Sequence, residues 1–174
     1  MVDNNLNKIV MAWSGCEIQI KEKDQDETQF LSIGAIKSKA TTLTAEDGDT
    51  LEAAMSGGKL VGYEKLAGSF VLATTVIEPQ MVLGLLSIAQ YELGTEEDEW
   101  DECLTVTTHV VEKEYELKLK PKKKGAWGLY APRCSVSIQP SWSEETGNEA
   151  VLTFGILKDL TKDFWYQKVK NITG

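Results

Sequence analysis

Histidine and cysteine are scarce in this chain of 174 residues, which has one histidine, His109, and three cysteines, Cys16, Cys103 and Cys134. A Ser-His-Asp or Cys-His site needs a histidine beside its nucleophile, and a zinc site needs several histidine or cysteine ligands. No GxSxG elbow or GxxxxGK[ST] phosphate loop is present. The cysteines are odd in number, widely spaced and without a CxxC pair, which indicates buried free thiols in a reducing cytoplasm. The sequence therefore predicts a non-enzymatic protein that uses no metal and no cofactor.

Long apolar runs and basic residues are also in short supply. No stretch approaches the ~20 apolar residues that a membrane-spanning helix needs, and the N-terminal residues lack the basic and apolar regions of a secretory leader. Lysine and arginine number 18 against 27 acidic residues, for a formal net charge of -9. Such a chain repels nucleic-acid phosphates, which disfavours a conventional DNA- or RNA-binding role but not a surface past which DNA moves. The length suits a single domain, residues 1–174.

Period-two alternation is the pattern that recurs along the chain. Apolar and polar residues alternate over residues 16–21, 104–110 and 134–138, and residues 150–157 form the last long apolar strand. Residues 65–77 are rich in β-branched residues and apolar on both faces, which predicts a strand covered on both sides. The whole chain predicts about eight to ten strands of ordinary length.

The period changes only once, after Pro79. Proline is accepted in a first helical turn, and the following apolar residues recur at helical spacing, which predicts a helix over residues 79–90. We therefore expect a mainly β fold, a β-sandwich or barrel of about eight to ten strands with one flanking α-helix.

Two turn signals lie between the strands expected at residues 16–21 and 65–77. Asp47-Gly48 tolerates positive φ, and a second turn is expected at residues 56–59, around Gly57 and Gly58. The segments around these turns predict a long hairpin that protrudes as an arm at about residues 39–60.

Charge is concentrated in two other segments. Residues 91–102 form an acidic loop without basic partners, which we interpret as a solvated loop or a functional acidic surface because it lacks EF-hand spacing. A basic turn follows, interpreted as solvated or as a partner for the acids of a neighbouring subunit. Its lysines are Lys120, Lys122, Lys123 and Lys124.

The order of these segments resembles that of phage major tail tube proteins. The resemblance rests on the glycine-led strand at residues 62–72, on the helix just after it within residues 77–86, and on the closing strands, which run from residue 119 to residue 157. It covers residues 33–157 and is one of order and spacing rather than of a sharp motif.

The resemblance implies a structural subunit. Six copies would close into a ring by head-to-tail contacts, rings would stack into a DNA-conducting tube, and each sheet would continue into its neighbour. The implied partners are further copies and other tail proteins, with no membrane, in the host cytoplasm during assembly and then in the virion tail. The arm would contact the next subunit through Thr42, Leu43, Thr44, Leu51 and Met55. The acidic loop would face the lumen with Glu96, Glu97, Asp98, Glu99, Asp101 and Glu102.

Two alternatives remain open from the sequence. The first is a monomeric carbohydrate-binding β-sandwich that would stack sugars on Trp127, Trp142 or Trp165. The second is the tube subunit of a contractile or type VI secretion system, which would share the fold and ring but carry effector proteins. A functional and a relic prophage product are equally compatible with the sequence.

Overall fold

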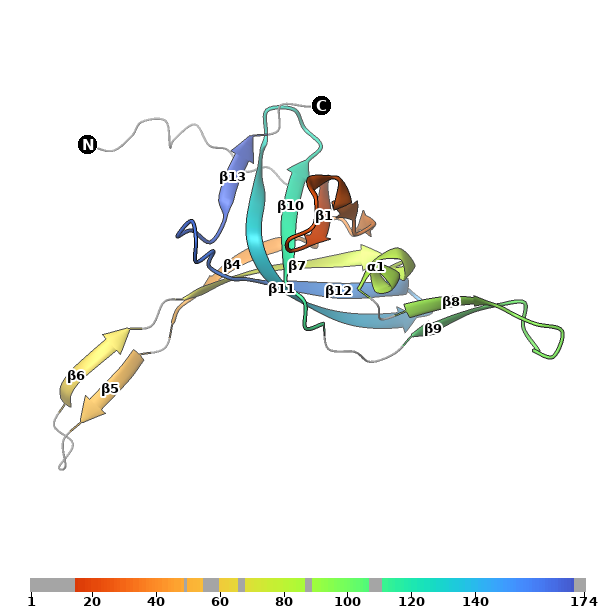
Figure 1. Cartoon of the computed structure of the whole chain (residues 1–174), viewed down its shortest axis with the longest axis horizontal. Coiled ribbons are helices and arrows are strands. Elements are labelled where there is room, and N and C mark those ends of the chain that lie inside the picture. The colour runs from red at the N-terminus through yellow and green to blue at the C-terminus, as the bar shows by residue number, and fades with distance from the viewer. Residues whose placement is uncertain are drawn as a thin grey trace.

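The computed structural model describes residues 15–48, 50–54, 60–65, 68–86, 89–106 and 111–170. These residues form thirteen strands, one short 3-10 turn (Glu27–Gln29) and one α-helix, α1 (Gln80–Leu85) (Figure 1). The mainly β fold with one flanking helix is thus confirmed. The strands are β1 (Cys16–Glu22), β2 (Leu31–Ser32), β3 (Ala35–Ile36), β4 (Thr42–Glu46), β5 (Thr50–Ala54), β6 (Leu60–Lys65), β7 (Ser69–Ile77), β8 (Ala89–Leu93), β9 (Glu102–Val106), β10 (Tyr115–Pro121), β11 (Trp127–Ser143), β12 (Gly147–Ile156) and β13 (Gln167–Lys170).

One curled sheet makes up most of the molecule. Its strand order is β2-β1-β10-β11-β12-β7-β3, with β4 also paired to β7 and β13 to β11. The long strand β11 belongs to both halves, because its first part pairs with β10 and its second part with β12. The two halves cross at a steep angle in Figure 1, so that their inner faces enclose the core.

The core consists of the alternate residues of both halves. In β10, Tyr115, Leu117 and Leu119 are buried while their neighbours are partly or fully exposed. In β12, Leu152 and Phe154 alternate in the same way, and both halves contribute to one apolar cluster. The period-two pattern of the sequence therefore identifies the inward-facing residues, because successive side chains of a strand point to opposite faces.

The helix is shorter than the sequence predicts. It ends at Leu85, and the expected residues 89–90 belong instead to strand β8. Val82, Leu83 and Leu86 already bury the apolar face of this short helix against the core. The chain beyond it gains a ladder of backbone hydrogen bonds by pairing with β9, which a longer helix would forfeit.

Strand number also exceeds the expected eight to ten, because several predicted segments are divided. The apolar run that contains Ile33 splits at Gly34 into β2 and β3, which pair with β1 and β7 respectively. Gly34 has a φ of 108°, a conformation that side chains other than glycine rarely adopt, so the chain changes sheet partner there. The acidic loop of the sequence is likewise shorter, since its two ends are the strands β8 and β9.

Two hairpins project from the curled sheet (Figure 1). One is the β5–β6 pair, which continues outward from β4 and β7. The other is the β8–β9 pair, which follows α1. The expected arm at residues 39–60 thus differs from the projecting element, since β4 pairs along β7 within the main sheet.

Candidate assembly surfaces

The first candidate surface is a pair of free sheet edges. Residues 135–143 of β11 pair with β12 on one side, and among the described residues no strand pairs with them on the other. On the far side of the same sheet half, β4 pairs with β7 and with no other strand of the described ranges. An exposed edge presents backbone donors and acceptors that invite another strand. Pro140 lies on the β11 edge, where proline is tolerated because no ladder partner needs its missing N–H.

The arm residues expected from the sequence lie at one of these edges or beyond it. Thr42, Leu43 and Thr44 are in β4, with the threonine side chains exposed and Leu43 packed against the core. Leu51 lies in β5 of the projecting hairpin. Met55 is outside the described residues, as is the expected turn at residues 56–59.

The outer face of the same sheet half is nearly free of charge. It is formed by the alternate residues of β4, β7, β12 and β11 that point away from the core. Its only charged residues are Glu46 and Glu149, and Glu149 forms an ion pair of 2.8 Å with Lys37. The remaining positions are Thr42, Thr44, Ser69, Val71, Ala73, Thr75, Ile77, Gly147, Val151, Thr153, Gly155, Ser135, Ser137, Gln139, Ser141 and Ser143.

This outer face corrects the expectation that β7 is covered on both sides. Leu72, Thr74 and Val76 are buried in the core, whereas the outward residues of β7 are half-buried and Ile77 is exposed. A charge-poor, partly apolar sheet face is unusual on a chain in which 26% of residues are charged. Depletion of charge is typical of the centres of protein interfaces.

The expected lumen-facing acids lie on the second projecting hairpin. Five of them, Glu96, Glu97, Asp98, Glu99 and Asp101, are exposed in the loop between β8 and β9, and exposed Glu102 is the first residue of β9. The structure therefore brings all six together at one tip. None of them forms an ion pair with a described lysine or arginine.

The loop has an ordered turn within it. Asp98 Oδ2 accepts hydrogen bonds from the Thr95 amide at 2.8 Å and the Thr95 hydroxyl at 2.9 Å. The hydrogen bond from the Thr95 amide is the main reason that the pKa of Asp98 is lowered, and the hydroxyl adds to it. The Gly94 amide donates to the Asp101 carbonyl at 2.7 Å, which closes the loop at its base. The acids are thus held on a defined turn at the end of a hairpin.

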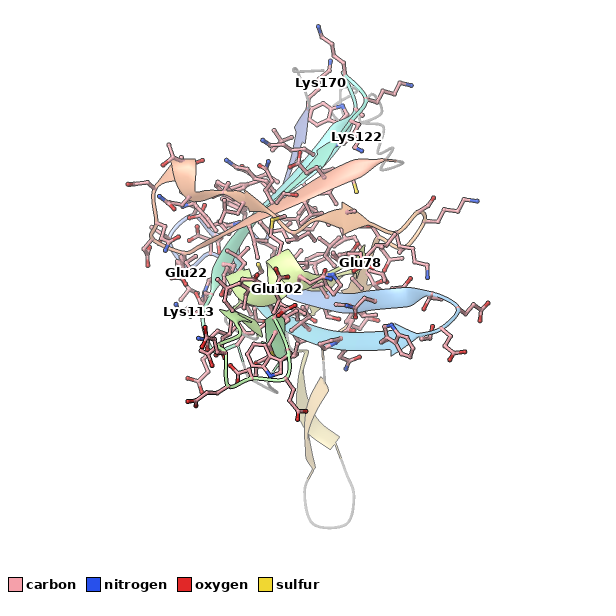
Figure 2. The ribbon with its side chains drawn as sticks, turned by 90° about the vertical axis from the view of Figure 1, so that its right-hand side faces the viewer. Glu22, Glu78, Glu102, Lys113, Lys122 and Lys170 are labelled. Atoms are coloured by element: carbon pink, nitrogen blue, oxygen red, sulfur yellow. The ribbon has the colours of Figure 1, made fainter. Side chains whose placement is uncertain are left out.

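The basic turn lies elsewhere on the molecule. It joins β10 to β11 and is flanked by β13, whose Lys170 lies against the turn at Gly125. Lys122 and Lys170 mark this end in Figure 2, well away from Glu102. The contribution of β13 was not predicted from the sequence, because nothing local indicates that residues 167–170 pair with the start of β11. The lysines gathered here are Lys120, Lys122, Lys123, Lys124, Lys168 and Lys170.

The three tryptophans do not share one platform. Trp127 and Trp142 occupy opposite ends of β11. Trp165 packs edge-on against Phe70, with ring centroids 5.8 Å apart. Only Trp142, with 69% of its surface exposed, is free to stack on a ligand. Of the three tryptophans expected to stack on a sugar, the structure therefore leaves one, Trp142, exposed for that role.

Chemical sites are sparse in the described part of the chain. A hollow of about 700 Å³ lies beside β1 and β3 and is lined in part by Cys16, Lys39 and Lys122. Burial raises the pKa of the Cys16 thiol, so that it stays protonated at neutral pH and is a poor nucleophile. Among the described residues no three His, Cys, Asp or Glu side chains gather closely enough to hold a metal ion. His109 is outside the described residues.

Within the described residues no helix has both the length and the apolar character required to cross a membrane.

No protein-family model matches the chain, and no curated protein matches it either.

Proposed function

We propose that this protein is the tail tube subunit of a phage or prophage, closing into six-membered rings that stack into a DNA-conducting tube. The proposal starts from the resemblance in segment order. The observation that carries it is the pair of free edges, β4 and the second part of β11, on opposite sides of one sheet half.

Strand direction favours closure of such a ring. Each successive pair in the order β4-β7-β12-β11 is antiparallel, so β4 and β11 run in opposite directions. Copies related by rotation about a ring axis carry their strands in the same sense. The β11 edge of one copy would therefore meet the β4 edge of the next as an antiparallel pair. A head-to-tail contact of this kind closes into a ring and removes both edges.

The charge-poor face suits the channel of that ring. It carries no lysine or arginine of its own, and the neighbouring Lys37 is paired with Glu149, so DNA phosphates would find no unpaired cationic side chain to hold them. The acidic loop, which the resemblance would place at the lumen, projects beyond the ends of β11 and β12 (Figure 1). The β5–β6 hairpin would reach a neighbouring subunit or ring.

The test is negative-stain electron microscopy of the concentrated protein and of two edge variants. Ser137→Lys and Thr44→Lys each place a charge at an exposed position on one edge, and charged edge residues block strand addition. The wild type should form six-fold rings or hollow tubes, whereas each variant should remain folded and form neither rings nor tubes. Thr161→Lys, at an exposed loop position, is the matched control and should assemble.

Two results would contradict the proposal. One is a wild-type protein that stays monomeric at every concentration up to ~1 mM. The other is ring formation by the edge variants as efficient as that of the wild type. Glycan binding by a monomer that is lost in Trp142→Ala would instead favour the carbohydrate-binding alternative.

A further inference from the structure

We propose a second self-contact, in which the β8–β9 hairpin of one copy docks on the lysine-rich end of another copy. The lysine-rich end is the β10–β11 turn with β13, as defined above. This contact is separate from the free sheet edges and does not depend on ring formation or on the proposed function.

One face of the β8–β9 hairpin is apolar and exposed. The register places Tyr91 opposite Leu104 and Ala89 opposite Val106, so their side chains share a face, and Leu93 continues it beside the acidic Glu102, its partner in the register. Tyr91 is 57% exposed, Leu93 68%, Leu104 39% and Val106 48%. Contiguous exposed apolar surface on a hairpin marks an interaction site rather than the scattered apolar residues of an ordinary surface.

The hairpin also has little support from its own chain. It forms a two-stranded sheet of its own, and within the described residues neither β8 nor β9 pairs with the main sheet. Only Ala89, at its base, packs against the core cluster. Since a lone two-stranded hairpin is marginally stable in water, a partner covering its apolar face would stabilise it.

Charge identifies the partner. The hairpin carries Glu92 and the six acids of its loop and tip, none of which forms an ion pair with a described basic residue. The six lysines of the lysine-rich end likewise form no ion pair among the described residues. By contrast, the basic residues that do form ion pairs lie elsewhere: Lys21, Lys23, Lys37, Lys113, Lys118, Arg133 and Lys158.

The two complementary ends cannot satisfy each other within one molecule. Lys122 and Lys170 lie at one end of the molecule and Glu102 lies well away from them (Figure 2). A second copy presents the missing partner surface. Exposed Val169 and the aliphatic stems of the lysines offer apolar contact to the hairpin face. Opposite charges at the rim would steer and orient the encounter.

Charge reversal tests this contact without disturbing the core. One variant reverses the charge of the hairpin loop and carries Glu96→Lys with Glu97→Lys. The other reverses the charge of the lysine-rich end and carries Lys122→Glu with Lys123→Glu. All four positions are exposed. Each variant alone should associate at least about tenfold more weakly than the unreversed protein. An equimolar mixture should recover the lost affinity, because each reversed surface then meets an oppositely charged one.

The measurement is sedimentation velocity over a concentration series, at low and at high salt. All proteins carry Thr44→Lys and Ser137→Lys, so the result is independent of the edge contacts and of ring formation. Glu144→Lys with Glu145→Lys, in the exposed turn between β11 and β12, is the matched control and should associate like the unreversed protein. Association should weaken as salt rises, because salt screens exposed charges.

The apolar part of the contact has its own variant. Leu93→Ser should weaken association while leaving the urea midpoint of the monomer unchanged, since that side chain is largely exposed.

Three results would overturn the proposal. These are an unreversed protein that does not self-associate at low salt, reversed variants that associate as tightly as the control, and a mixture that stays as weak as its components.

Discussion

At the scale of single residues, the fold contains a buried lysine whose charge has to be paired. Lys21 is 5% exposed and forms an ion pair of 2.8 Å with Glu116, while its amine also donates to the Gln25 carbonyl. Glu116 accepts a second hydrogen bond from the Tyr130 hydroxyl at 2.8 Å. Burial, together with the hydrogen bond donated to Glu116, raises the pKa of Tyr130. Such a buried network is tolerated because each charged group has partners.

Removing one member of this network should be costly. Lys21→Met leaves the Glu116 carboxylate largely buried without its cation, and we expect a loss of about 3–5 kcal/mol in the free energy of unfolding. Adding Glu116→Gln should recover part of that loss, because the amide oxygen still accepts the Tyr130 hydrogen bond without a buried charge. Both effects are measured by urea unfolding of protein that also carries Thr44→Lys and Ser137→Lys, so that ring formation does not contribute.

An exposed lysine provides the control for this prediction. Lys113, which is paired with Glu22, has a side chain that is 64% exposed, and the Glu22 side chain is 33% exposed. Replacement of Lys113 by methionine should cost less than about 1 kcal/mol. Equal losses in Lys21→Met and Lys113→Met would show that burial of the Lys21–Glu116 pair contributes nothing to its importance.

At the scale of elements, strand β11 organises the fold. The sequence shows it as two short apolar runs, yet the structure has one continuous strand, Trp127–Ser143. The strand continues because successive parts of it find different partners, first β10 and β13, then β12. Gly128 allows the close approach near its start, where an added Cβ would lie 2.1 Å from the Leu119 carbonyl oxygen.

Gly128→Ala should therefore push β10 and β11 apart. The clash is with backbone, which cannot move aside as a flexible side chain can, so we expect a loss toward the upper end of the ~1–3 kcal/mol typical of overpacking. Gly147→Ala is the comparison. Gly147 has open space around it but a φ of 72°, so the substitution should cost only the ~1–2 kcal/mol of a left-handed backbone.

Thermal and urea unfolding of the two glycine variants separate these effects. If Gly128→Ala were no less stable than the wild type, the close pairing of β10 and β11 near their turn would be wrong. Circular dichroism of the native state checks that both variants keep the mainly β fold.

At the scale of the whole molecule, the curl of the sheet places one residue at the junction of its halves. Cys134 pairs with Tyr115 of β10 and with Ile156 of β12, and its thiol donates a hydrogen bond to the Tyr115 carbonyl at 3.2 Å. Burial raises the pKa of the Cys134 thiol to about 12. This thiol is therefore protonated and covered as long as both halves stay together.

Thiol labelling should report on that arrangement. We expect half-buried Cys103 to react with a disulfide reagent in the native state, Cys16 to react there more slowly because burial keeps its thiol protonated, and Cys134 to react only at the rate of global unfolding. The sites are identified by mass spectrometry of protein quenched at successive times, and sub-denaturing urea should accelerate labelling of Cys134 selectively. Rapid native labelling of Cys134 would contradict a junction buried by both halves.

The fold class and the inward-facing residues follow from the sequence alone. Alternation in β10 and β12 follows directly from the two-residue repeat of a strand, which is a local property. The acidic and basic segments could also be located from composition alone. Local patterns could not predict where α1 ends and β8 begins, because the same short apolar run is compatible with a helix and with a strand. The pairing of β8 with β9 decides between the two.

Which segments meet is a property of the folded chain and could not be predicted from the sequence. The two free edges, the charge-poor face across β4, β7, β12 and β11, and the addition of Lys168 and Lys170 to the basic turn all depend on pairings between residues far apart in the chain. Such pairings are selected by the burial of a shared core and by the satisfaction of backbone hydrogen bonds across the whole sheet. No short window of sequence contains that information, whereas the strand repeat and the net charge are present in the chain before it folds.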